Sequence, residues 1–411
     1  MEVVMSTGQS RLHFFEAADA LGCVGVKIKL VSGWVPRNPH SWLVRFLSKV
    51  TRHNIAPGMA KRTVKSENVQ IKSDAFSEFF FQFLMVLTRR HPAVNLWVSR
   101  FGWIVTGFSS RRYLKDAQIF HVRSGGGHGG AIRKAHKLGM KVIADHSIAH
   151  PDFLARELEG EYKKNGKFFS MGMKSPLWRL IAEDCQLADV VVVNSNFVKD
   201  TFIEAGYPES KVKVVYWGIR NDFFGVREKT YETVPFGRHL LFTGTFNFRK
   251  GAEYIIDAVK SLRQKGLDFT FDVAGTVVVT EAQRKECAEL GIKLLGVLPQ
   301  DELKGLFERT DIYVFPSLAE GCARSGVEAM GAGLCAIATK ESGLPITDGE
   351  TGLLVPTRNA AAIAEKIEWL FDRPDEVRRI GSAAAKLVRT EYTWEKYAEN
   401  MKRVYEEVVR T

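Results

Sequence analysis

Residues 311–333 read DIYVFPSLAEGCARSGVEAMGAG, and this stretch decides the fold. Its apolar beginning predicts a buried strand that ends at Pro316–Ser317. A loop carrying Glu320 and Gly321 follows, and a helix is expected to begin near Ser325. A strand, a loop and a helix in this order form the repeating unit of a parallel sheet covered by helices.

The rest of the chain repeats this alternation. Strands are expected at Glu2–Met5, Val24–Val31, Ala117–Val122, Lys141–Asp145, Val190–Asn194, Val212–Tyr216, His239–Thr243, Phe269–Ala274, Lys293–Val297, Asp311–Phe315 and Cys335–Ala338. This predicts an α/β protein with two doubly wound, Rossmann-like domains that face each other across a cleft. The domains are expected over residues 1–225 and 226–393, and an amphipathic helix is expected at residues 394–411. The basic stretches 53–75 and 155–175 are interpreted as irregular surface loops.

Composition and charge limit the function classes. With 411 residues, 45% apolar and 26% charged, the chain is a folded protein rather than a disordered one. The net charge of +11 is concentrated at the front, where residues 1–150 hold 22 basic and 8 acidic residues, whereas residues 226–411 carry a net charge of −2. We therefore expect a basic surface on the front domain that binds a partner.

Several features favour a cytoplasmic location. The five cysteines are scattered and form no CxxC pair, which indicates a reducing compartment. The N-terminal residues lack the pattern of a secretory signal. The most apolar stretch, Phe79–Leu87, is too short to span a bilayer.

The loop after the 311–315 strand suits a diphosphate. Backbone N–H groups of Gly321, Cys322 and Ala323, next to a helix N-terminus, are expected to donate to phosphate oxygens. The carboxylates of Glu320 and Glu328 are suited to accept hydrogen bonds from sugar hydroxyls. Alternatively, these two residues are a solvated loop acid and an acid that stabilises the helix dipole.

Two cations stand at a second strand-to-helix junction, in the stretch LFTGTFNFRKG at residues 241–251. Arg249 and Lys250 are expected to neutralise a diphosphate leaving group. The alternative is a pair of solvated cations, although cations are disfavoured at a helix N-terminus unless an anion compensates them.

A histidine ends a strand of the front domain in the stretch VIADHSIAHP, residues 142–151. His146 can hydrogen-bond a substrate hydroxyl or hold a proton near neutral pH. His121, His128 and His150 lie nearby in the sequence, so a metal cluster is an alternative. No acidic or cysteine partner completes a recognised ligand set, and we expect no metal and no other cofactor.

Together these motifs resemble the retaining glycosyltransferases of family 4, which have the GT-B fold. The resemblance rests on FRKG at 248–251, PS at 316–317, E-x7-E from Glu320 to Glu328, the following AMGAG, SGLPITDGETGLLVP at 342–356, Gly8, DH at 145–146, ADVVVVNSNFVKDTF at 188–202 and the terminal WEKY helix. It covers nearly the whole chain. The terminal helix is then expected to cross back onto the front domain.

The resemblance implies a residue-by-residue reading of a nucleotide-sugar site. The residues implied to contact the diphosphate or sugar of the donor are Gly8, Thr245, Arg249, Lys250, Gly321, Cys322 and Ala323. Leu298 and Glu328 are implied to contact the nucleoside. His146 and Glu320 are implied to contact the sugar near the reacting centre. Two positions differ from the family pattern. Thr245 lies where many members have an arginine, and the first strand-helix turn has one glycine, Gly8, where many members have two or more. The implied reaction is metal-free, retaining hexosyl or related transfer in which the leaving diphosphate takes the proton of the acceptor.

The front domain would hold the acceptor, a glycan or a lipid-linked glycan for cell-envelope polysaccharide or glycolipid synthesis. Trp97, Phe101 and Trp103 lie among Arg100, Arg111 and Arg112, a mixture that suits the inner face of an anionic membrane. The alternative is that Phe79–Leu87 is a core helix and the cations are a solvated face. Other readings of the chain are a sugar-nucleotide epimerase, a non-catalytic nucleotide-sugar binder and a basic nucleic-acid-binding protein, although no nucleic-acid motif is present.

Overall fold

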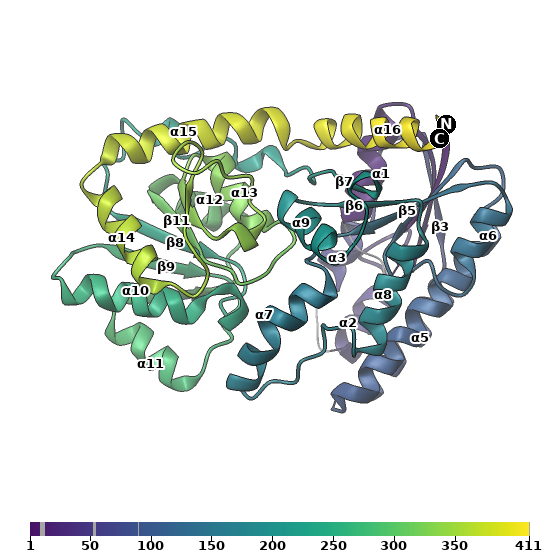
Figure 1. Ribbon diagram of the computed structural model, residues 1–411, viewed down its shortest axis with the longest axis horizontal. Helices are drawn as coiled ribbons and strands as arrows, with labels where there is room; N and C mark the ends of the chain where they lie inside the picture. Colours follow the sequence, from purple (N-terminus) through teal and green to yellow (C-terminus); the bar gives the residue numbers. More distant parts are fainter. Residues whose placement is uncertain (9–12, 52–54, 89, 411) are drawn as a thin grey trace.

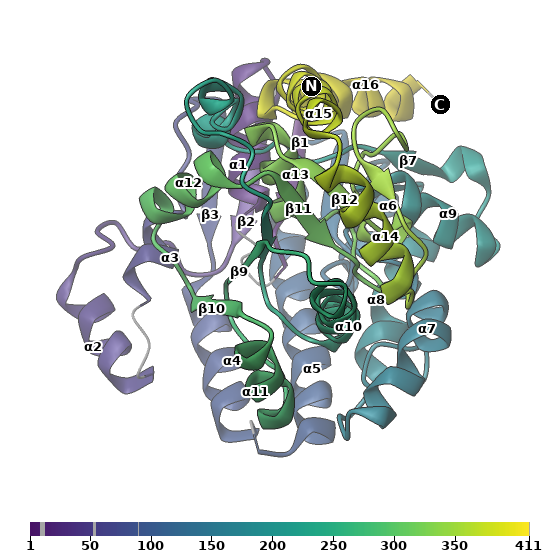
Figure 2. The same cartoon turned by 90° about the vertical axis from the view of Figure 1, so that its left-hand side faces the viewer.

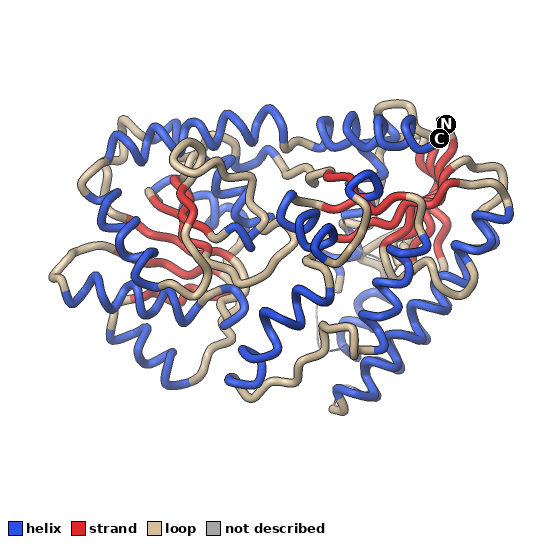
Figure 3. The backbone as a smooth tube through the Cα atoms, viewed as in Figure 1, coloured by secondary structure: helices blue, strands red, loops and turns tan. Residues whose placement is uncertain are grey.

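The structure is a computed structural model that describes residues 1–8, 13–51, 55–88 and 90–410. Two β-sheets follow each other along the chain, and helices surround each of them (Figure 1). Coloured by secondary structure, the strands form two separate groups (Figure 3). The predicted α/β fold with two Rossmann-like domains is confirmed.

The first sheet has seven parallel strands in the order β3-β2-β1-β4-β5-β6-β7. They are β1 (Glu2–Ser6), β2 (Lys27–Ser32), β3 (Val69–Ser73), β4 (Ile119–Arg123), β5 (Lys141–His146), β6 (Val190–Val193) and β7 (Val212–Val214). Alternate residues enter different cores: Val3 and Met5 pack in one cluster and Val4 packs in another. Both faces of the sheet are therefore buried, as is typical of parallel sheets.

The second sheet has six parallel strands in the order β10-β9-β8-β11-β12-β13. They are β8 (His239–Thr243), β9 (Thr270–Ala274), β10 (Ile292–Gly296), β11 (Ile312–Phe315), β12 (Cys335–Ala338) and β13 (Leu353–Leu354). In both sheets the strand order reverses next to the first strand of the domain. Ligands of doubly wound sheets bind at such a switch point, beyond the carboxyl ends of the strands.

The helices of the first domain are α1 (His13–Cys23), α2 (Trp42–Thr51), α3 (Ala56–Ala60), α4 (Ala75–Thr88), α5 (Pro92–Ser110), α6 (Ala131–Lys137), α7 (Pro151–Lys164), α8 (Pro176–Leu187) and α9 (Asn196–Glu204). Those that follow are α10 (Ala252–Gln264), α11 (Glu281–Glu289), α12 (Gln300–Arg309), α13 (Arg324–Ala332), α14 (Ala360–Phe371), α15 (Pro374–Glu391) and α16 (Trp394–Arg410). No helix among the described residues is both long and apolar enough to cross a membrane.

Two expected loops are wrong. The stretch 53–75 contains α3 and the five-residue strand β3, and most of α7 lies in the stretch 155–175. The amphipathic pattern of residues 10–21 also predicts a helix, and its expected start at Ser10 lies outside the described residues. In β3 (VQIKS) polar residues alternate with only two apolar ones, so its hydrophobic signal is weak.

The last two helices join the domains. Figure 1 shows α15 lying along the second domain and α16 continuing along the first. Tyr397, Met401 and Tyr405 of α16 are buried in the same cluster as Phe14 and Phe15 of α1. A core of the first domain is thus completed by residues almost 400 positions away, as the family resemblance implies.

Candidate active site

Two loops meet at the switch point of the second sheet, after β8 and after β11. Gly251 has a φ of +81° and lies so close to the second loop that an added Cβ would be 2.2 Å from the Pro316 carbonyl oxygen. The backbone N–H of Leu318 donates to the Arg249 carbonyl oxygen at 2.8 Å. A glycine is therefore required for the two motifs to pack together.

Arg249, Lys250 and Glu320 form one charged cluster between these loops. The Arg249 guanidinium donates to the Glu320 carboxylate at 2.7 Å and to the Ala319 carbonyl oxygen at 2.6 Å. The Lys250 ammonium lies 3.5 Å from the same carboxylate oxygen. All three side chains are largely buried, with exposed fractions of 15 to 20%. The sequence-predicted cations and acid are thus brought together, and in this state they neutralise each other.

The N-terminus of α13 lies at the same place, but its donors differ from the prediction. The Ala323 N–H donates to the Ser342 carbonyl oxygen at 3.0 Å, so it is not available to a phosphate in this conformation. The helix begins at Arg324, and the N–H groups of Arg324 and Ser325 have no intrahelical acceptor. Of the predicted set, Ala323 is thus excluded in this conformation, while the expected contacts of Gly321, which is buried, and Cys322, which is half-buried, stay predictions.

Glu328 lies on the first turns of α13 and is paired with Arg324 of the same helix. Its carboxylate accepts from the Arg324 guanidinium at 3.3 Å, and Arg324 also donates to Glu16 of α1 at 3.1 Å. Burial raises the pKa of Glu328, and the charge of Arg324 opposes that effect. Glu328 is therefore positioned by its own helix and by the first domain.

His146 ends β5 of the first domain. Its Nδ1 atom lies 2.9 Å from Ser124 Oγ, and its ring packs edge-on against Phe202. Burial, followed by the charge of Arg123, lowers the pKa of His146 to about 3. His146 is thus neutral near pH 7 and can accept or donate one hydrogen bond through Nε2.

The His146 and Glu320 loops touch directly. An added Cβ on Gly321 would lie 2.0 Å from the Ser147 carbonyl oxygen, and Ser195 Oγ donates to the Gly321 carbonyl oxygen at 2.5 Å. The two residues expected nearest the reacting centre therefore belong to adjoining loops of different domains.

Three residues that were expected to contact the donor, Gly8, Thr245 and Leu298, are not part of the Glu320 cluster. Gly8 follows β1 with a φ of +60°, and an added Cβ would be 2.0 Å from the Trp103 ring. Thr245 is half-buried after β8, and Leu298 is half-buried beyond the edge strand β10. No described hydrogen bond or ion pair links them to the Glu320 cluster.

The four histidines of the first domain do not converge. His121 lies 2.7 Å from the Tyr405 hydroxyl, His128 contacts Asp184 and Glu183, and His150 accepts from Asp152 N–H as the N-cap of α7. Among the described residues, no group of three or more His, Cys, Asp or Glu side chains is arranged to hold a metal ion.

Sequence reasoning missed the glycine-rich loop SGGGHGG at residues 124–130. The buried Asp184 carboxylate accepts from the N–H groups of Gly125 and Gly127, at 2.7 Å each, and lies 2.6 Å from His128 Nδ1. An added Cβ on Gly126 would lie 3.4 Å from the Gly8 Cα. The signal that could have identified this loop is its five glycines, which directly follow a predicted strand.

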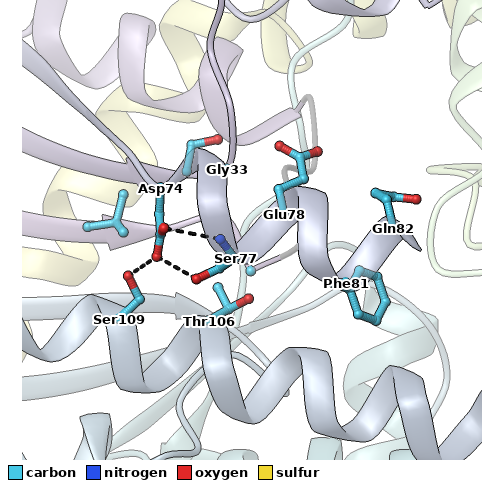
Figure 4. A pocket seen from close by; sticks show the side chains of 11 residues that line it. Gly33, Asp74, Ser77, Glu78, Phe81, Gln82, Thr106 and Ser109 are labelled. Atoms are coloured by element: carbon cyan, nitrogen blue, oxygen red, sulfur yellow. Dashed lines mark hydrogen bonds between the residues drawn. The ribbon is translucent and has the colours of Figure 1, made fainter. Parts of the chain in front are cut away.

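A pocket opens beside Gly8, at the carboxyl end of β2 and against α4 and α5 (Figure 4). Asp74 Oδ2 accepts hydrogen bonds from the hydroxyls of Ser77, at 2.8 Å, and Ser109. Burial opposes ionisation of Asp74, but these hydrogen bonds outweigh it and lower its pKa. The pocket is therefore lined by a fixed carboxylate and several hydroxyls, including that of Thr106.

Comparison with known proteins identifies both halves of the chain. Residues 237–373 match the family model described as glycosyl transferases group 1, and residues 37–223 match glycosyltransferase family 4. Each half of the chain is therefore similar to a glycosyltransferase family. The predicted resemblance is confirmed.

Similar proteins carry the same family name. The uncharacterized glycosyltransferase MJ1607 of Methanocaldococcus jannaschii is 27% identical over 54% of this chain and 60% of its own length. The amylovoran biosynthesis glycosyltransferase AmsK of Erwinia amylovora is 26% identical over 70% of this chain and 69% of its own. The match thus spans about three fifths to two thirds of these relatives.

Solved GT-B structures share the fold across the whole chain. HepE of Anabaena, in complex with UDP and glucose, is 14% identical and superposes with a TM-score of 0.60 over 99% of this chain and all of its own. Sucrose-phosphate synthase of Thermosynechococcus elongatus is 15% identical, with a TM-score of 0.65 and 99% coverage of both chains. The chain therefore has the GT-B fold.

Proposed function

We propose that the chain is a retaining glycosyltransferase that moves a hexosyl or related group from a nucleoside-diphosphate sugar. The observation that carries this proposal is the cluster of Arg249, Lys250 and Glu320 at the N-terminus of α13, with the His146 loop directly across the cleft. The similarity in fold to HepE with bound UDP-glucose supports a nucleotide-sugar donor.

The cluster suits a diphosphate leaving group. A diphosphate that binds Arg249 and Lys250 competes with Glu320 for both cations. Glu320 is then released to accept hydrogen bonds from hydroxyls of the transferred sugar. The leaving diphosphate, held by these cations and by the first N–H groups of α13, takes the proton of the acceptor hydroxyl on the face where the new bond forms, so that the configuration is retained.

Donor binding tests this proposal first. Unfolding temperature is measured with UDP-, GDP-, ADP- and dTDP-sugars, because a ligand of the native state raises its stability by mass action. One nucleotide class is expected to raise it in the wild type and to have little effect in Lys250→Ala. Interconversion of the sugar without any acceptor would favour an epimerase instead.

The acceptor is proposed to bind on the first domain near the small pocket beside Gly8 (Figure 4). Ser77 and Ser109 already donate to Asp74 and Thr106 donates to the Gly102 carbonyl oxygen, so hydroxyls of a glycan would donate to the oxygens of these side chains. Similarity to AmsK supports an acceptor in polysaccharide or glycolipid synthesis. A Thr106→Val variant is expected to raise the acceptor KM and leave the donor KM unchanged.

The helical hairpin formed by α4 and α5 is the proposed membrane contact. The two helices run side by side and project from the first sheet (Figure 2). Phe76, Phe80, Phe83 and Leu87 follow one face of α4, and all four are exposed, Phe76 by 81% and Phe83 by 60%. The alternative that Phe79–Leu87 is a core helix is thus wrong, because Phe81 is the one residue buried among those described in α4.

Cations accompany the exposed apolar side chains of the hairpin. The guanidinium of Arg100 lies 5.6 Å from the Trp97 ring centroid, and that of Arg111 lies 5.0 Å from the Phe108 ring centroid. The α5 segment contains no acidic residue. Exposed aromatic rings with cations beside them match the interface of an anionic bilayer, where rings insert and cations pair with headgroups.

Liposome flotation tests this contact. The wild type is expected to float with vesicles of phosphatidylcholine and phosphatidylglycerol at low salt. The double variant Phe80→Ser, Phe83→Ser is expected to stay in the bottom fraction of the gradient. Phe168→Ser, which removes an aromatic side chain with 56% exposure outside the hairpin, is the matched control. Equal flotation of all three proteins would contradict the proposal. A membrane contact on this domain, together with the five free cysteines, supports a cytoplasmic enzyme at the inner membrane face.

A further inference from the structure

Asn194 is a buried amide without hydrogen bonds at the end of β6. The strand is formed by four valines, and Asn194 follows directly with 2% of its surface exposed. Neither its Oδ1 nor its Nδ2 atom has a hydrogen-bond partner among the described residues. A buried polar group left unpaired costs about 1–3 kcal/mol of stability, so both atoms of the amide need an explanation.

A second unpaired atom lies on the neighbouring strand. His146 at the end of β5 is 1% exposed, and its Nε2 atom has no hydrogen-bond partner among the described residues. The register pairs His146 with Val193, the residue before Asn194. Three unsatisfied polar atoms therefore gather at adjacent strand ends, where no single structural role accounts for them.

The Asn194 amide nitrogen faces the motif loop of the second domain. An added Cβ on Gly321 would lie 2.8 Å from Asn194 Nδ2, and the next residue, Ser195, donates to the Gly321 carbonyl oxygen. Gly321 directly follows Glu320, whose carboxylate is held by Arg249 and Lys250. The amide thus lies between the two loops that flank the proposed diphosphate site.

We propose that Asn194, together with His146, binds hydroxyl groups of the transferred sugar and determines which sugar is accepted. This inference rests on the proposed function and deepens it. An amide offers one acceptor and one donor group, which matches two adjacent hydroxyls, and the neutral imidazole adds one further bond. Sites that hydrogen-bond a substrate hydroxyl discriminate strongly against analogues that lack it, because the buried polar groups are then left unpaired.

Replacement by a similar apolar side chain separates this role from a structural one. Asn194→Leu removes the unpaired amide, so the thermal stability of the free protein is expected to stay equal or rise. The kcat/KM for the nucleotide sugar is expected to fall at least 100-fold, while the Kd of the free nucleoside diphosphate stays unchanged. Asn196→Leu, an exposed position on the adjoining helix, is the matched control and is expected to change neither value.

Deoxy analogues of the donor give the second readout. The donor is the fastest substrate among UDP-glucose, UDP-galactose, UDP-N-acetylglucosamine and GDP-mannose, and it is compared with its 2-, 3-, 4- and 6-deoxy forms. The wild type is expected to discriminate at least 100-fold against one of them. Asn194→Leu and Asn194→Ala should both lose that discrimination.

Two outcomes would overturn the inference. One is a variant that keeps the wild-type discrimination, and the other is an Asn194→Leu protein that is destabilised while its kcat/KM is unchanged. A wild-type protein that turns over no nucleotide sugar would instead contradict the proposed function itself, so the two failures are distinguishable.

Discussion

Glu320 is the residue on which the charges of the site converge. Its carboxylate neutralises Arg249 and Lys250, which explains how two cations are tolerated beside the N-terminus of α13. In the proposed reaction, the diphosphate of the donor competes with this carboxylate for both cations.

Lys250→Ala is expected to lower the kcat of transfer by about 10²- to 10³-fold, because the developing charge on the leaving diphosphate loses a preorganised cation. Glu320→Ala is expected to lose transfer while the fold is kept. Initial rates with the identified donor are measured for each variant. Lys304→Ala, an exposed lysine on the same domain, serves as the control. Normal turnover by Lys250→Ala would contradict the assignment.

At the scale of elements, the sequence predicts the order of strand, loop and helix better than it predicts which segments pack against them. The β11 strand, the loop with Glu320 and the helix carrying Glu328 were predicted nearly as they stand, because strand, breaker and helix signals follow each other closely there. For α4, the same spacing of phenylalanines fits a buried face or a solvent-exposed one. Local sequence contains no information about which partner covers that face.

The donors at α13 show a second limit of sequence reasoning. The helix start was predicted within one residue, yet the N–H of Ala323 is occupied by Ser342, some twenty residues later in the chain. The Asp184 carboxylate that holds the glycine-rich loop likewise comes from α8. Such contacts depend on how distant segments pack, so they could not be predicted from motif spacing.

The glycine-rich loop is expected to give stability a pH dependence. Burial opposes the charge on His128, but hydrogen bonds with Asp184 and Glu183 outweigh it and raise the pKa of His128 above 6.5. The charged histidine therefore stabilises the fold below pH 6.5, and this contribution is lost as the pH rises through the raised pKa.

A His128→Gln variant tests this dependence. It is expected to be less stable than the wild type by about 2 kcal/mol at pH 6, with a smaller difference at pH 9, as measured by urea denaturation. His40→Gln, at an exposed histidine, is the control. An equal loss of stability by His128→Gln at both pH values would argue against a charged His128.

At the scale of the whole molecule, the two domains are fastened by segments from both ends of the chain. α16 packs on α1, and Arg324 joins Glu16 to Glu328 across the cleft. Arg358 also pairs with Glu157 and Glu161 of α7. Of the 22 basic residues among the first 150, five fall within residues 75–112, which cover the exposed hairpin and the turn after it.

The crossing helix is expected to be essential for the stability of the first domain. Met401→Ala removes a fully buried side chain from a core shared with α1, which should cost about 2–5 kcal/mol and lower the unfolding temperature. Val409→Ala, at a position of the same helix with 38% exposure, should have little effect. Calorimetry of both variants measures the difference, and similar unfolding temperatures would show that α16 is not part of that core.

The most direct test of the central claim follows nucleotide-sugar turnover by proton NMR. Purified protein is incubated with the stabilising donor and a membrane or glycan fraction as acceptor source. We expect donor consumption that depends on Lys250 and a first-formed product with the anomeric configuration of the donor. An inverted product, or no consumption of any donor by the wild type, would contradict a retaining glycosyltransferase.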